Sequence, residues 1–148
     1  MASVFDVAKY ILEKTGSLST MKLQKLVYYA QAWSLVWDEY PDAPLFKERI
    51  EAWVNGPVVP ALFATHKGIY SVDASYPAFA QCGDNLSDNQ KDTINKVIEF
   101  YGCHSSQWLK DLTHAEEPWI QSRKGLPEGE RGNSEITLES MAEYYGSL

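Results

Sequence analysis

The fold of this chain is decided by one stretch, Thr20–Trp37, which reads TMKLQKLVYYAQAWSLVW. Its apolar residues recur at the spacing of one helical face: Leu23, Leu26, Val27, Ala30, Trp33 or Ser34, and Trp37. A second, semi-polar face carries Gln24, Tyr28, Gln31 and Leu35. A helix that is apolar on more than one side is usually surrounded by other elements. We therefore predict that residues 20–37 form the central helix of the domain.

The segment before this helix predicts a first, amphipathic helix. Ser3 is a suitable N-cap with Asp6 in the first turn, and Gly16 is a suitable end. Between them, apolar residues recur at helical spacing, namely Val4, Val7, Ala8, Ile11 and Leu12. Ser17 or Ser19 then caps the central helix.

The only strand signal lies in Phe46–Val54, after a loop that we predict over residues 38–44. Side chains alternate along it between two sets, Ile50, Ala52 and Val54 against Arg49, Glu51 and Trp53. The next residues, Asn55-Gly56-Pro57, are typical of a turn and are predicted to block continuation of the strand. We therefore expect one short β element near 46–54.

The rest of the sequence predicts further short helices. Pro60 suits the first turn of a helix that ends near Lys67-Gly68, and residues 69–86 are expected to be irregular. The remaining predicted elements are a helix over Asp88–Tyr101 capped by Ser87, one starting at Ser105 or Ser106, a short turn over Glu117–Arg123, a polar mobile loop over Lys124–Ser134, and a last helix capped by Thr137. The predicted fold class is a single, compact, mainly α domain over residues 1–148.

Composition limits the classes of partner. The net charge is −7, and it is uneven: residues 1–74 carry seven Lys and Arg against eight Asp and Glu, and residues 75–148 carry six against twelve. An acidic surface repels phosphate backbones, so nucleic acid is not an expected partner. The sequence shows no signal peptide and no apolar run long enough for a membrane span, so we expect no membrane partner and a cytoplasmic location.

No metal or cofactor site is predicted. The two cysteines, Cys82 and Cys103, have neither metal-ligand spacing nor the pattern of a disulfide framework. No nucleophile is paired with a base in the sequence, so we assign no catalytic residue and do not expect an enzyme.

Three blocks rich in Trp, Tyr, Gln and Asn occur in order along the chain: LQKLVYYAQAW at 23–33, EAWVNGPVVP at 51–60 and LTHAEEPW at 112–119. Together with Arg123 and the closing segment Ile136–Tyr145, they resemble the Panacea domain family, also described as SocA-like antitoxins or phage-associated GepA-like domains. The resemblance covers about residues 17–145. Three ordered blocks at matching spacing are far more specific than a single motif.

The resemblance implies a mainly helical domain, found in bacteria and phages, that in many members neutralises a toxin by direct contact. It thus implies a cognate toxin as the partner, encoded by a neighbouring gene. One member acts as a proteolytic adaptor that delivers its toxin to a protease. The alternative function is therefore an adaptor, or a phage-encoded interaction protein, that hands a client to host machinery.

The second block offers the first candidate binding residues. Trp53 has a side chain enriched in binding hot spots, and a rigid turn at Asn55, Gly56 and Pro57 would lower the cost of ordering a recognition loop. The alternative is that Trp53 covers the core while Gly56 supplies a positive φ that the turn requires. We favour this structural role for Gly56 and Pro57, and leave both roles open for Trp53.

The central helix offers a second set, Gln24, Tyr28 and Gln31, which could contact a partner from one helical face. The favoured alternative is a buried polar network that ties this helix to its neighbours. On the same helix, Lys22 and Lys25 are predicted to lie on a small solvated basic edge with Lys14.

The third block offers His114, Glu117 and Trp119, and the resemblance adds Arg123. A histidine beside carboxylates can titrate near neutral pH and could act as an acid or base. The favoured alternative is a network at helix ends, with His114 ending one helix and Glu117 capping the next. Like the other candidates, these four residues are predicted to contact the partner.

Overall fold

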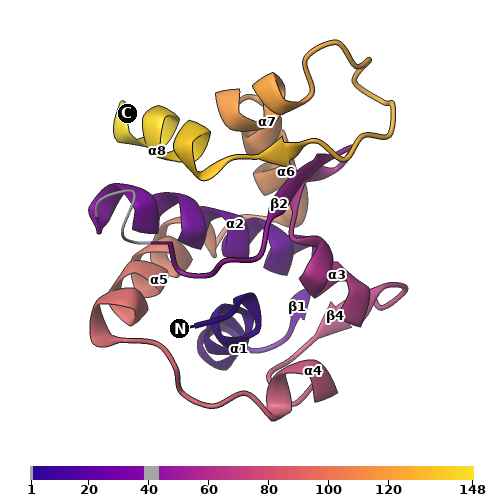
Figure 1. The fold of residues 1–148 in the computed structure, drawn as a ribbon. Helices are drawn as coiled ribbons and strands as arrows, with labels where there is room; N and C mark the ends of the chain where they lie inside the picture. Colours follow the sequence, from indigo (N-terminus) through magenta and orange to yellow (C-terminus); the bar gives the residue numbers. More distant parts are fainter. Residues whose placement is uncertain (1, 39–43) are drawn as a thin grey trace.

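The predicted central helix is α2, Thr20–Trp37, and the other elements are arranged around it (Figure 1). The computed structural model describes residues 2–38 and 44–148. Residues 23–32 of α2 are all buried, which confirms that the helix is enclosed on more than one side. The Ser19 hydroxyl accepts a hydrogen bond from the Lys22 N–H, so Ser19 is the N-cap.

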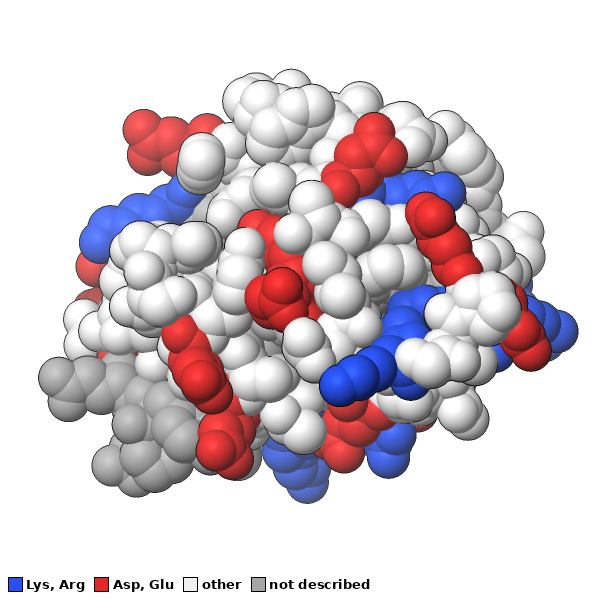
Figure 2. All heavy atoms as spheres, turned by 90° about the horizontal axis from the view of Figure 1, so that it is seen from above, with Lys and Arg blue, Asp and Glu red and all other residues white. Residues whose placement is uncertain are grey.

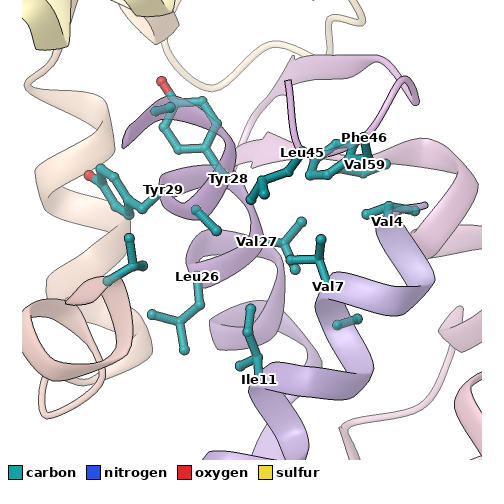
Figure 3. Close-up of a cluster of buried hydrophobic side chains, with 14 of the residues drawn as sticks. Val4, Val7, Ile11, Leu26, Val27, Tyr28, Tyr29, Leu45, Phe46 and Val59 are labelled. Atoms are coloured by element: carbon teal, nitrogen blue, oxygen red, sulfur yellow. The ribbon is translucent and has the colours of Figure 1, made fainter. Parts of the chain in front are cut away.

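The first helix, α1, spans Val4–Thr15 as its stripe predicts. Ser3 and Asp6 form a capping box, and Gly16 ends the helix with a φ of 80°. Val7 and Ile11 point from α1 toward Leu26 and Val27 of α2 (Figure 3). These side chains are fully buried and form one half of the hydrophobic core.

The later helices lie within the predicted ranges, and three of them begin at predicted caps. They are α3 (Pro60–His66), α5 (Asp88–Tyr101), α6 (Ser106–His114), α7 (Glu117–Ser122) and α8 (Leu138–Gly146). Ser87, Ser105 and Thr137 each accept a hydrogen bond from the backbone of the helix that they precede. The mainly α fold is therefore confirmed.

One segment differs from the prediction, and a second lies mostly outside the described residues. The segment 69–86, predicted to be irregular, contains β4 (Ser71–Val72) and the short helix α4 (Pro77–Ala80). The loop predicted over 38–44 lies, for residues 39–43, outside the described residues.

The β structure is more extensive than the single element predicted. β2 (Ile50–Trp53) lies inside the predicted range, but it is the central strand of a three-stranded antiparallel sheet in the order β3-β2-β5. β3 is Gly56–Val58 and β5 is Glu135–Ile136. A second sheet pairs β1 (Leu18–Ser19) with β4. Strands of two or three residues carry too little alternation to be recognised in a sequence.

The predicted turn at Asn55-Gly56-Pro57 is wrong in extent. The chain reverses at Val54-Asn55, and Gly56 and Pro57 already belong to β3, where they pair with Trp53 and Ala52. Pro57 is tolerated because β3 is an edge strand, where a missing N–H removes no necessary ladder bond. Residues 50–58 therefore form a β-hairpin.

The other half of the core is aromatic and holds a buried carboxylate. Tyr28 and Tyr29 leave α2 on the sides away from α1 (Figure 3). Tyr29 and Tyr145 of α8 each donate a hydrogen bond to Glu116 Oε1, at 2.7 and 2.8 Å. The Tyr28 hydroxyl lies 3.0 Å from that of Tyr145. We call these four residues the tyrosine–Glu116 cluster.

Candidate functional site

The three sequence blocks meet at Gly56 in the β-hairpin. Its φ is 119°, and a Cβ placed there would lie 2.9 Å from Cε of Lys25 and 3.1 Å from Oγ1 of Thr113. Lys25 comes from the first block, Gly56 from the second and Thr113 from the third. Both the backbone conformation and the close approach require glycine, which bears out its structural role.

Trp119 of the third block, together with Arg123, is hydrogen-bonded to the backbone of the hairpin. Trp119 donates its indole N–H to the Trp53 carbonyl at 2.8 Å, and Arg123 Nη1 donates to the Ala52 carbonyl at 3.1 Å. The Arg123 guanidinium also lies over the Trp119 ring, 5.1 Å from its centroid. Trp119 and Arg123 are both buried, so they position the hairpin and present little surface of their own.

Arg123 also holds the polar loop that follows it. Its Nη2 donates to the carbonyls of Pro127, Glu128 and Glu130. The Ser134 carbonyl in turn accepts a hydrogen bond from the Ala52 N–H. The loop over 124–134 is thereby fastened at both ends to the back of the hairpin, and its predicted mobility stays a prediction.

The Trp53 side chain is held rigidly at the partly exposed edge of the hairpin. Its indole N–H donates to Glu51 Oε1 at 2.9 Å, and its ring meets Phe63 of α3 edge-on at 4.9 Å between centroids. With its backbone fixed by Trp119 as well, this side chain is preorganised. Rigid, partly exposed aromatic side chains are typical anchors of binding sites.

Trp53 borders a cavity of about 310 Å³, which we call the hairpin pocket. Four segments line it: the start of α2, the hairpin, α3 and the loop after α7. The lining residues are Thr20, Met21, Gln24, Lys25, Trp53, Val54, Asn55, Val58, Phe63, His66, Arg131 and Gly132. The lining combines apolar and aromatic side chains with a few polar ones, which is the usual composition of a ligand pocket.

Lys25 lies at this pocket and not on the solvated edge that the sequence predicted. Its exposed fraction is 1%, because α2 is enclosed on all sides at this level. Burial, with a smaller contribution from the positive charge of Lys110, lowers the pKa of Lys25 to about 8. Within residues 2–38 and 44–148, no group forms a hydrogen bond or ion pair with it.

Gln24 is both a core residue and part of the pocket wall. Its Oε1 accepts the Val59 N–H at 2.9 Å, so its amide nitrogen faces His66 Nε2 at 3.0 Å. An amide nitrogen can only donate, and His66 Nε2 must therefore be the acceptor and the ring neutral. Burial agrees with this state, because it lowers the pKa of His66.

Tyr28 and Gln31 are enclosed in the core. Gln31 donates to the Phe46 carbonyl at 2.8 Å and accepts the Leu45 N–H at 2.7 Å, and it has no exposed surface. Tyr28 belongs to the tyrosine–Glu116 cluster. Direct contact with a partner would require either side chain to leave the core, so the buried polar network accounts for their placement.

His114 of the third block is not paired with the carboxylates beside it in the sequence. His114 stacks on Trp119 at 3.9 Å between ring centroids, and its Nε2 has no hydrogen-bond partner among the described residues. Burial and the nearby Lys110 and Lys25 lower the pKa of His114. Its charged form is thus disfavoured at neutral pH.

The carboxylates beside His114 are engaged elsewhere. Glu116 turns inward to the tyrosine cluster, and Glu117 is exposed and accepts a hydrogen bond from Gln121. The residue at the N-cap of α7 is Glu116 and not Glu117, and its side chain does not cap the helix. His114 thus ends α6 as predicted, but Glu117 does not cap α7, and His114 stacks on Trp119.

Neither a metal-ligand cluster nor a membrane-spanning helix is found among the described residues. In ranges 2–38 and 44–148, no three His, Cys, Asp or Glu side chains are gathered to hold a metal ion. No described helix is both long and apolar enough to cross a membrane. On the face seen from above in Figure 1, the Lys and Arg side chains are interrupted by acidic and uncharged ones (Figure 2).

Sequence comparison agrees with this geometry. Residues 23–120 match the model of the family described as "Antitoxin SocA-like, Panacea domain". This range includes most of the central helix, the whole hairpin and the third block, 112–119. No curated protein and no solved structure matched the chain.

Proposed function

This chain belongs to the antitoxin SocA-like, Panacea domain family, and we propose that it is a binding module that neutralises a cognate toxin by direct contact. The partner is a protein encoded by a neighbouring gene, and the encounter takes place in the cytoplasm. The chain acts by occluding the toxin's working surface and not by catalysis. The family membership is the observation that carries this proposal.

The face around the hairpin pocket is the surface best suited to this contact. Trp53 and Asn55 belong to the hairpin and line the pocket. Met21 also lines the pocket and is 39% exposed. Thr20, also on the pocket wall, is hydrogen-bonded to the carbonyls of Ile69 and Tyr70. Tyr70 is 84% exposed. Partly exposed aromatic side chains on a fixed backbone supply contact area at low cost in conformational entropy.

Co-expression with the product of the neighbouring gene tests the proposal. If that product alone arrests growth, and this chain restores growth and co-purifies with it, the antitoxin function is supported. A neighbour that is harmless, or that fails to bind, contradicts it. A toxin that binds but is rapidly degraded in the presence of this chain would indicate the adaptor function instead.

Trp53→Ala tests the assigned face. We expect it to weaken toxin binding by about 2 kcal/mol, because the variant removes a preorganised aromatic anchor. Trp37→Ala is the matched control, since Trp37 is 44% exposed and ends α2, while the pocket lies at the start of that helix. Equal affinities of the two variants in calorimetry, with both folded, would move the interface away from the hairpin.

A further inference from the structure

The hairpin pocket contains a positive charge that the fold does not neutralise. Lys25 is 1% exposed and lines the pocket, and among the described residues no acceptor is bonded to it. An ammonium group with little access to water and no protein acceptor is costly, and buried charges are normally paired. An unpaired buried cation at a cavity therefore indicates a missing partner that is negatively charged.

The neighbouring polar groups carry no negative charge, and each is hydrogen-bonded to another residue. Both ends of the Gln24 amide are occupied, by Val59 and by His66. The Thr113 hydroxyl donates to the Lys110 carbonyl at 2.9 Å. His66 is neutral, as its hydrogen bond with Gln24 requires. The described wall thus carries one buried cation, Lys25, with a second, Arg131, on the exposed loop at the rim.

The other residues of the pocket wall indicate that the uncharged part of the ligand is apolar. Met21, Trp53, Val58 and Phe63 contribute apolar surface, and the cavity of about 310 Å³ has room for a ring or a branched side chain. One buried cation compensates one negative charge. A phosphate dianion would bring a second charge into apolar surroundings, whereas a carboxylate brings only one.

We propose that the hairpin pocket binds a carboxylate that carries a short apolar body, with the carboxylate on Lys25 and the body against Trp53 and Phe63. Such a group occurs in free aliphatic or aromatic acids and at the C-terminus of a polypeptide that ends in an apolar residue. The proposal concerns this chain alone and holds whether or not the chain neutralises a toxin.

Matched acid and amide probes test the proposal on the complete chain. Phenylacetate and phenylacetamide represent the free acid and its neutral counterpart, and a tetrapeptide ending in Phe, with a free or an amidated terminus, represents the polypeptide. Trp53 lies on the pocket wall, so binding is followed by the change in the tryptophan fluorescence of the chain and checked by calorimetry. We expect at least one acid to bind ten or more times tighter than its amide.

The variants assign the effect to one side chain. Lys25→Met keeps the length and apolar stem of the side chain and removes the charge, so we expect the tenfold preference for acid to disappear. Lys67→Met is the matched control: Lys67 is exposed and adjoins the pocket residue His66, and its loss should leave the preference intact.

Each outcome has a defined meaning. Preference for phenylacetate over the peptide identifies a site for free acids, and the reverse identifies a site for chain termini; both support the proposal. Equal binding of acid and amide, an unchanged preference in folded Lys25→Met, or failure of all four probes to bind overturns it. The acid–amide comparison on the unaltered chain decides the proposal even if the variant does not fold.

Discussion

Glu116 and Lys25 are both ionisable and both withdrawn from solvent, Glu116 beside α2 and Lys25 within it, but the fold treats them differently. Glu116 receives two tyrosine hydroxyls on one carboxylate oxygen, while Lys25 meets no acceptor among the described residues. The first arrangement ties α2 to α8 and to the start of α7. The second leaves a group available to a ligand. The contrast separates a buried carboxylate that the fold satisfies from a buried cation that it leaves without an acceptor.

Removing the Glu116 carboxylate should produce the largest loss of stability. Glu116→Ala leaves the hydroxyls of Tyr29 and Tyr145 buried without an acceptor and opens a cavity, so we expect a loss of about 4 kcal/mol in the free energy of unfolding. Glu116→Gln is the control, because its Oε1 can accept both hydrogen bonds. Urea denaturation of the two variants measures the difference, and similar losses would show that the cluster does not depend on the acceptor.

The next effect concerns the place where Lys25 approaches the hairpin. Gly56→Ala places a methyl group 2.9 Å from Lys25 Cε at a φ of 119°, and we expect a loss of about 3 kcal/mol. Gly125→Ala is the matched control, since Gly125 also has a positive φ, 92°, but has open space around it. Its loss should be about 1 kcal/mol. Thermal unfolding measures both losses. Equal losses in the two variants would show that the whole effect comes from the positive φ and none from the close contact.

Lys25→Met should change stability in the opposite direction. It removes an uncompensated buried charge, and we expect a gain of about 2 kcal/mol at pH 7. The pKa of Lys25 is about 8 in the folded chain and about 10.4 in the unfolded chain, so between these values the folded state binds fewer protons. The stability of the unaltered chain therefore rises with pH in this window.

The gain from Lys25→Met should accordingly shrink as pH rises from about 8 to about 10. Denaturation at a series of pH values measures it, with Lys67→Met as the control for loss of an exposed charge. A variant that is less stable than the unaltered chain at pH 7 would mean that Lys25 supports the fold.

The smallest effect is the pH dependence at Glu116. Burial raises the pKa of Glu116 and outweighs the two tyrosine hydrogen bonds, which lower it. The folded state then binds more protons than the unfolded state just above the usual pKa of Glu, so this residue makes stability decline as pH rises through that window. Glu116→Gln should flatten the decline, and an equally steep profile in the variant would assign it to other groups.

The features predicted correctly from the sequence are those that depend on residues close together in the chain. The N-caps Ser3, Ser87 and Thr137 are contacts within one turn, and all three lie where the sequence places them. The enclosed position of α2 followed from its apolar sides. Family resemblance correctly brought forward the blocks that meet at the hairpin.

What the sequence could not show depends on contacts between distant segments. β3 and β5 are too short to have a pattern and exist because both pair with β2. Lys25 was predicted from its residue type to be a solvated cation, yet it lies on the pocket wall. The signal that could have located Lys25 was its place inside a helix with no side left for solvent.

The helices α1 and α8, which pack on either side of α2, determine how large a segment must be transferred for this domain to work in another protein. The segment that matches the family, 23–120, includes neither α1 nor α8. Yet α1 contributes Val7 and Ile11 to the core, and α8 contributes Tyr145 to Glu116. A gene fusion that transferred only the matched segment would inherit the hairpin without these two helices and with only part of the pocket wall, because Thr20, Met21, Arg131 and Gly132 lie outside it. The transferable unit is therefore larger than the stretch by which it is recognised.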